Sequence, residues 1–140
     1  MSRYAEGTPV TVQQSRGEIT GILAKHGVET MAWGTKPGGD YLRFELGGRA
    51  YLFHIEKPTT EQIFELYPNH RDTEAKLEAE WRRRWRANVL LLKAKLEFAD
   101  GETSTVEREL MPYMLLKGGK TLEQIILAGT LPLLAPGGAE

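Results

Sequence analysis

Cysteine is absent from the 140 residues of this chain. Disulfide bonds, thiolate metal ligands and cysteine nucleophiles are therefore excluded, and an intracellular location is compatible with the composition. Long apolar runs are absent too, since the longest, such as residues 89–92, have four residues, whereas a membrane-spanning helix needs roughly 20. The N-terminal residues contain no apolar run typical of a signal peptide. We therefore expect a soluble cytoplasmic protein without a membrane partner.

The chain also has no basic excess. Its 18 Lys and Arg residues stand against 19 Asp and Glu residues, which gives a net charge of −1. Proteins that bind duplex DNA usually carry more basic than acidic residues, because much of their affinity comes from neutralising phosphates. An anion site in this chain must therefore be a local patch, and a small ligand is favoured over a polyanion.

Motifs of catalytic and metal sites are missing as well. His26, His54 and His70 show no spacing typical of metal ligands, and no serine lies in a G-x-S-x-G context. The segment GGKT at 118–121 lacks the first glycine of a phosphate-binding loop, because that position is Met114. The sequence thus predicts no metal, no cofactor and no catalytic residues, and it favours a binding protein over an enzyme.

The chain does have the composition of a globular domain, with 41% apolar and 26% charged residues. We predict one α+β domain over residues 1–140: a small N-terminal antiparallel sheet with one helix, followed by a long central helix and two shorter C-terminal helices. The sheet-rich part covers about residues 1–58 and the helical part about 59–130. An irregular tail follows at 131–140.

The first elements are predicted from local patterns. Residues 8–12 are expected to form a short strand. A helix over 13–27 follows, because Ser15 and Glu18 have the spacing of a capping box.

A β-hairpin is predicted next. Residues 28–35 are expected as a strand, 36–40 as a turn, and two alternating segments, 41–46 and 49–55, then flank a glycine pair at 47–48. Their core face would carry Leu42, Phe44, Leu46, Tyr51 and Phe53.

The other face of the hairpin is a candidate binding surface. Tyr41 would lie opposite His54, with Arg43 diagonal to it. An aromatic ring, an arginine and a histidine on one face could stack a base and hold its phosphate. The alternative, which we favour from the sequence, is an ordinary solvent-facing side of a half-buried sheet.

Helical patterns fill the rest of the chain. Residues 60–67 are either a short helix ended by Pro68 or, within 59–72, part of a loop. One long helix is predicted over residues 73–99.

Two further capping boxes predict the C-terminal helices. Ser104 and Glu107 would begin a helix that Pro112 bends or shortens. Thr121 and Gln124 would cap a final short helix.

The segment WRRRWRANVLLLKAKLEF at 81–98 places four arginines around two tryptophans. On a helix with about 100° between residues, one continuous stripe faces the core. The stripe contains Leu77, Trp81, Trp85, Val89, Leu92 and Leu96. The tryptophans are therefore expected in the core rather than as platforms for stacked bases.

The basic residues of this helix scatter, so they do not form one patch. Arg82, Arg86 and Lys93 share one flank, which could hold an anion. A solvated flank that pairs with Glu78 and Glu97 is the interpretation that we favour.

Leu90 and Leu91 lie off the core stripe, so this helix is apolar nearly all round at its middle. Such a helix is covered on several sides, either by later helices or by another subunit. We therefore expect a homo-oligomer.

Three segments carry a resemblance to a known group of proteins: YAEGTPVTVQQSRGEITGIL at 4–23, EAEWRRRWRANVLLLKAKLE at 78–97 and KTLEQIILAG at 120–129. In these segments the chain resembles small, mostly uncharacterised proteins encoded in phage and prophage genomes. The resemblance implies an accessory protein that acts inside a bacterial host, and it implies no catalytic residues.

The function expected on these grounds is non-enzymatic binding of a small anionic nucleotide, which would sequester a host immune signal. The candidate ligand-binding residues are Tyr41, Arg43 and His54, or Arg82, Arg86 and Lys93. Two alternatives stay open. One is a single-stranded nucleic-acid-binding protein of phage replication or recombination; the other is an inhibitor that binds a host enzyme through the apolar surface near Leu90 and Leu91.

Overall fold

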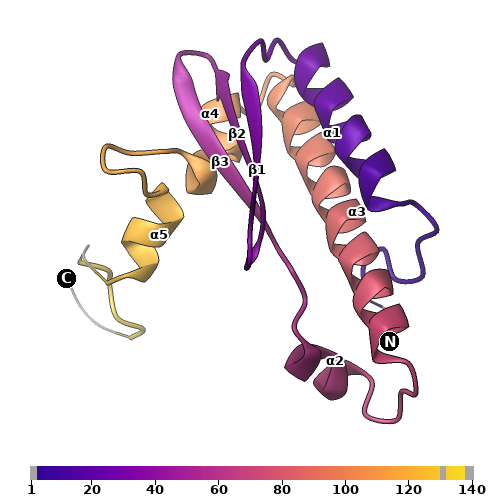
Figure 1. Cartoon of the computed structure of the whole chain (residues 1–140). Helices are drawn as coiled ribbons and strands as arrows, with labels where there is room; N and C mark the ends of the chain where they lie inside the picture. Colours follow the sequence, from indigo (N-terminus) through magenta and orange to yellow (C-terminus); the bar gives the residue numbers. More distant parts are fainter. Residues whose placement is uncertain (1–2, 130–131, 138–140) are drawn as a thin grey trace.

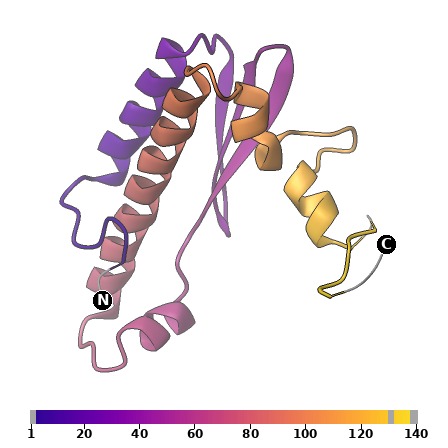
Figure 2. The same ribbon diagram turned by 180° about the vertical axis from the view of Figure 1, so that it is seen from behind.

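The structure, a computed structural model, describes residues 3–129 and 132–137 (Figure 1). Helices α1 (Val12–Lys25) and α3 (Thr73–Ala99) lie side by side and cover one face of a three-stranded antiparallel sheet. Helix α5 (Leu122–Leu127) lies on the other side of the sheet, as the view from behind shows (Figure 2), whereas the shorter helix α4 (Val106–Glu109) packs against α3. The predicted α+β fold, with its N-terminal helix, small sheet and long central helix, is confirmed.

Helix α3 has the bounds that the sequence predicts. The Asp72 side chain caps its first turn by accepting a hydrogen bond from the Ala75 backbone N–H. The predicted core stripe is buried at Trp85, Val89, Leu92 and Leu96 and half-buried at Leu77 and Trp81. Both tryptophans thus pack inside the domain, because their periodic spacing turns them toward α1 and the sheet.

Helix α1 begins earlier than predicted, and the strand expected at residues 8–12 is not formed. Thr11 and Gln14 form the capping box, whereas Ser15 is fully buried within the helix. Thr11 itself has extended backbone angles, as is usual for a helix N-cap. The helix cap thus lies four residues before Ser15, the cap that the sequence predicted.

The sheet is built from β1 (Met31–Lys36), β2 (Gly39–Leu46) and β3 (Arg49–Glu56), in that order. The two-residue loop at 47–48 gives the predicted register, with Leu46 opposite Arg49. The buried residues of this face are Leu42, Phe44, Tyr51, Phe53 and Ile55. Trp33 of β1 joins them to α3, because its ring centroid lies 5.5 Å from that of Trp85.

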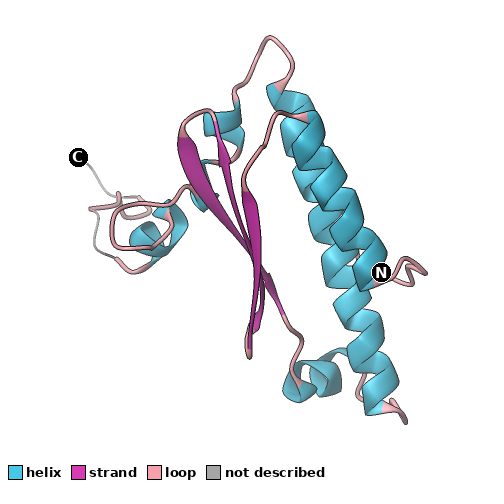
Figure 3. Ribbon diagram, turned by 45° about the horizontal axis from the view of Figure 1, so that its top comes forward, coloured by secondary structure: helices cyan, strands magenta, loops and turns pink. Residues whose placement is uncertain are grey.

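The segment for which the sequence left a helix and a loop open forms a helix, α2 (Thr60–Leu66). Thr59 and Gln62 form its capping box, and Ile63 is its buried residue. The helix lies at the end of α3 opposite to the hairpin loop (Figure 3).

The C-terminal helices are shorter than predicted. Thr105, not Ser104, caps α4 (Val106–Glu109), while the Ser104 hydroxyl donates a hydrogen bond to Glu109 instead. The 3₁₀ helix η1 (Met111–Tyr113) contains Pro112 and follows at once. Proline thus shortens the helix by enforcing a tighter turn.

Helix α5 (Leu122–Leu127) is capped by Thr121 and Gln124, as predicted. The stretch 111–129, here called the C-terminal arm, is held to the sheet by Met114, which forms a β-bridge with Tyr51. Residues 132–137 are irregular, as expected, and the rest of the predicted tail lies outside the described residues. No helix in the described ranges has the length and apolar content needed to cross a membrane.

Leu90 and Leu91 differ in their surroundings. Leu90 is half-buried, and Leu91 is 39% exposed. Helix α4 packs against α3, so part of the cover expected for this helix comes from a later helix of the same chain.

Gly39 should tolerate no side chain, because its φ is +144° and a Cβ atom would lie 2.2 Å from the Ile55 carbonyl oxygen. We expect Gly39→Ala to lower the free energy of unfolding by about 2–3 kcal/mol. Gly38→Ala is the matched control, since a Cβ atom there meets nothing within 4 Å. Urea denaturation followed by circular dichroism compares the two variants. Equal stabilities would contradict this account of the β1–β2 turn.

Candidate functional site

The outer face of the sheet, which points away from α1 and α3, carries three of the predicted binding residues. Tyr41 pairs with His54 in the β2–β3 register, as expected, and their rings are stacked at 4.2 Å with an interplanar angle of 7°. The Lys36 ammonium lies 4.9 Å from the centroid of the Tyr41 ring. Arg43 is exposed two residues along β2, and alternation along the strand places it on the same face as Tyr41.

Small residues leave space beside the stacked rings. Ala32 pairs with Arg43, and Gly34 pairs with Tyr41. A Cβ atom at Gly34 would meet nothing within 4 Å. The β1 side of the outer face is therefore a flat and open shelf.

The C-terminal arm forms a wall opposite this face and leaves two hollows. One, of about 260 Å³, lies between Tyr41, His54 and Glu56 of the sheet and Glu123 of α5. The other, of about 360 Å³, is lined by Arg43, Ala50, Leu52, Leu115, Leu116 and Gly119. Leu52 lines both hollows, so they are adjacent, and we call them together the outer cleft.

The two ends of the outer cleft differ in charge. Glu56 and Glu123 line the end beside His54, whereas Arg43 is the charged residue that lines the other end. Arg43 faces Leu52, which is two residues from His54, so the ends lie roughly 7 Å apart along the strand. The outer cleft thus has a carboxylate end, a stacked aromatic pair and a guanidinium end.

Tyr113 adds a neutral hydroxyl to the carboxylate end of the outer cleft. Burial, and to a smaller extent the charge of Glu123, raises the pKa of Tyr113 above its ordinary value. The hydroxyl therefore stays protonated at neutral pH and can donate a hydrogen bond.

The predicted basic flank of α3 lies in a different part of the molecule. Arg82 pairs with Glu78 at 2.9 Å, as the favoured interpretation had it, and Arg86 pairs with Glu18 of α1. Lys93 is exposed on the same helix. An anion on this flank would have to compete with two carboxylates, so anion binding there stays a prediction without added support.

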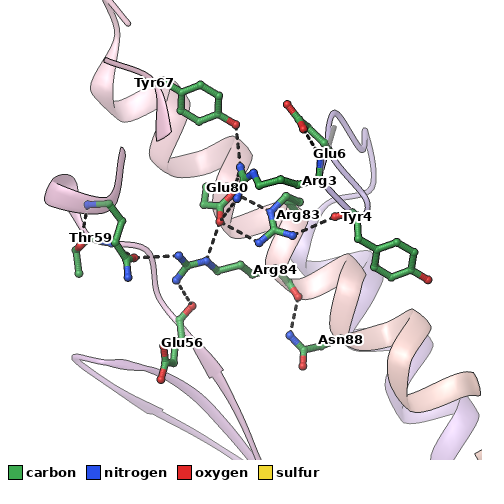
Figure 4. Close-up of polar contacts among 11 residues, drawn as sticks. Arg3, Tyr4, Glu6, Glu56, Thr59, Tyr67, Glu80, Arg83, Arg84 and Asn88 are labelled. Atoms are coloured by element: carbon green, nitrogen blue, oxygen red, sulfur yellow. Dashed lines mark hydrogen bonds and ion pairs between the residues drawn. The ribbon is translucent and has the colours of Figure 1, made fainter. Parts of the chain in front are cut away.

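A buried charged cluster was missed by the sequence reasoning. The Glu80 side chain is 1% exposed, and its oxygens accept hydrogen bonds from three arginines (Figure 4). The shortest distances are 2.7 Å to Arg3, 2.8 Å to Arg83 and 2.9 Å to Arg84. The spacings from Glu80 to Arg83 and Arg84, three and four residues on a helix, are a signal that could have found two of the three partners.

Each arginine of this cluster also binds a second part of the chain (Figure 4). Arg84 donates to the Glu56 carbonyl oxygen at 3.1 Å and to the Gln62 side chain at 2.9 Å. Arg83 donates to the Tyr4 carbonyl oxygen and Arg3 to the Tyr67 hydroxyl, at 3.0 and 2.9 Å. The cluster therefore ties α3 to the N-terminal segment, to α2 and to the end of β3.

Protonation of Glu80 is strongly disfavoured. Burial alone would raise the pKa of its carboxyl, but the hydrogen bonds from Arg83, Arg3 and Arg84 outweigh burial and lower it to about 2. The same interaction raises the pKa of the Arg3 guanidinium. Because the guanidinium groups are occupied by internal partners, we assign the cluster a structural role.

Comparisons with known proteins add no assignment: a scan against protein-family models, a search of curated proteins and a search of solved structures each give no match. Within residues 3–129 and 132–137, no group of three or more His, Cys, Asp or Glu side chains is placed to hold a metal ion.

Glu80→Gln should cost roughly 3 kcal/mol of unfolding free energy at pH 7, because a pKa that falls from 4.5 to about 2 on folding represents stabilisation of this order. Since the folded pKa lies below the unfolded value, this stabilisation is complete above about pH 4.5 and is lost as the pH falls through about 2. Urea denaturation at several pH values should show the difference from the wild type shrinking over this window.

Glu78→Gln is the matched control for Glu80→Gln. Glu78 lies on the same helix and also pairs with an arginine, but its side chain is 71% exposed. Its loss should cost less than about 1 kcal/mol. Equal effects of the two substitutions would show that burial of Glu80 does not strengthen its ion pairs.

Proposed function

We propose that this protein binds a small nucleotide in the outer cleft and holds it without catalysis. The observation that carries the proposal is the stacked pair Tyr41–His54 between a guanidinium end and a carboxylate end of one cleft. A nucleotide has the same order of groups: an anionic phosphate, and a flat base whose edge carries N–H donors.

The base would lie against the aromatic pair and the shelf beside Gly34. Aromatic side chains stack bases of any kind, and each such contact contributes about 1–3 kcal/mol. Glu56 and Glu123 would accept hydrogen bonds from the N–H groups of the base. A guanine edge presents adjacent N–H donors that suit a carboxylate, so guanine nucleotides should bind more tightly than uridine nucleotides.

The phosphate would lie at the Arg43 end of the cleft. A guanidinium group suits phosphate because its N–H donors are arranged as a planar fork. The turn at 117–120 borders this end through Gly119 and carries two exposed lysines, Lys117 and Lys120. Their charges favour an anion here, while the carboxylates at the other end oppose it.

Retention without turnover would remove a nucleotide signal from solution, which is the role proposed for a phage-type accessory protein. A single strand of nucleic acid is less well supported than a small nucleotide. The arm walls one side of the outer face, and the net charge of −1 gives little attraction for a polyanion.

Arg43→Gln should weaken binding of a guanine nucleotide at least about tenfold, because loss of a hydrogen bond to a charged group costs roughly 1.5–3 kcal/mol. His54→Ala should weaken it similarly by removing half of the stacked pair. Isothermal titration calorimetry with GMP, AMP and UMP measures these effects. Lys93→Gln is the matched control, since Lys93 lies on α3, away from the cleft, and its loss should leave affinity unchanged.

The opposite pattern of affinities would show that the nucleotide binds on the flank of α3. If Lys93→Gln together with Arg86→Gln abolished binding while Arg43→Gln left it intact, the outer cleft would not be the site. Absence of heat for each nucleotide, with a correctly folded protein, would end the nucleotide proposal.

A further inference from the structure

An apolar groove on the C-terminal arm carries a second inference. Met111 and Pro112 of η1 form one wall, and Leu122, Ile126 and Leu127 of α5 form the other. The groove encloses about 380 Å³. The helix α5 that lines this groove lies on the side of the sheet away from α1 and α3, where the arm projects from the domain (Figures 1 and 2).

Helix α5 lacks the cover that a helix of its length needs. It has six residues, none of which is buried, and among the elements described it packs against η1. Helices this short are not stable in water unless an apolar face packs against something. Leu127 is nevertheless 76% exposed, so this end of the apolar face is open to a further surface.

The charges at the rim of the groove indicate what that surface is. Arg108 of α4 lies on the wall formed by η1, and Glu123 lies on the α5 wall. Neither side chain forms an ion pair within the part of the chain that the structure describes. The groove is thus apolar at its centre and carries opposite charges on its two walls.

We propose that a second copy of this chain covers the groove in a two-fold symmetric dimer. In such a contact the same patch meets itself, so each residue of one wall faces the opposite wall of the other copy. Helix α5 of each copy would lie in the groove of the other. Each Glu123 would then pair with Arg108 of the partner copy, which makes the patch complementary to itself in charge as well as in apolar character.

This dimer would also complete the outer cleft. Glu123 lines both the groove and the carboxylate end of the cleft. A partner that fixes α5 would fix this wall, so nucleotide and dimer should stabilise each other by linkage. This last consequence rests on the proposed function; the dimer itself does not.

Sedimentation velocity over a range of protein concentrations, without nucleotide, tests the dimer. Leu127→Asp should give a monomer, and because the side chain is exposed in one chain, the variant should keep the wild-type circular dichroism spectrum. Arg108→Glu and Glu123→Arg should each weaken the dimer at least about tenfold, because each places like charges opposite one another twice per dimer. The double variant should restore the dimer to near wild-type strength.

Several outcomes would overturn the proposal. A wild-type chain that stays monomeric to millimolar concentration would refute the dimer and would indicate that a different protein covers the groove. A dimer that persists in Leu127→Asp would place the interface elsewhere. The same conclusion would follow if the double variant dimerised no more strongly than the single variants.

The calorimetric titrations keep this result separate from the nucleotide proposal. A dimer that forms as expected but gives no heat with nucleotide would refute only the proposed function. Nucleotide binding by a monomeric wild type would refute only the dimer.

Discussion

The arrangement of the N-terminal segment, α2 and the end of β3 around α3 depends on the ion pairs of the buried Glu80 carboxylate. A charge removed from water must be compensated, and here three guanidinium groups from two distant parts of the chain compensate it. Arg84 then binds the backbone of Glu56, so the charge that anchors α3 also fixes the end of β3. The carboxylate end of the outer cleft is therefore positioned by a cluster that no ligand needs to touch.

The two faces of the sheet have separate roles. The inner face is filled by aromatic and aliphatic side chains that pack on α3 through Trp33 and Trp85. This packing leaves the outer face free to carry charged and stacked groups. The C-terminal arm covers part of the outer face and leaves the rest open, which is why a cleft forms there rather than a second core.

Patterns among neighbouring residues predicted the elements whose structure depends mainly on those neighbours. The two-residue loop at 47–48 fixed the hairpin register, and with it the contact between Tyr41 and His54. The apolar period of α3 gave its bounds and its buried face. The start of α1 was predicted less well, because Ser15 and Glu18 have the spacing of a capping box although Thr11, four residues earlier, caps the helix. The Glu80 cluster and the wall of the outer cleft depend on contacts across long separations, such as that of Arg3 with Glu80, which no periodicity encodes.

The edges of the sheet limit how the protein can associate through its backbone. On the β3 side Met114 and Leu115 already occupy hydrogen-bonding positions, at Tyr51 and Ala50. Among the described residues, β1 pairs with β2 alone, so it offers the one continuous free edge. Growth of a fibre by strand addition needs two free edges on each molecule. The arm interrupts the β3 edge at Ala50 and Tyr51, so a strand can be added along the whole of β1 but not along the whole of β3, and backbone association of this chain favours a pair over an extending fibre.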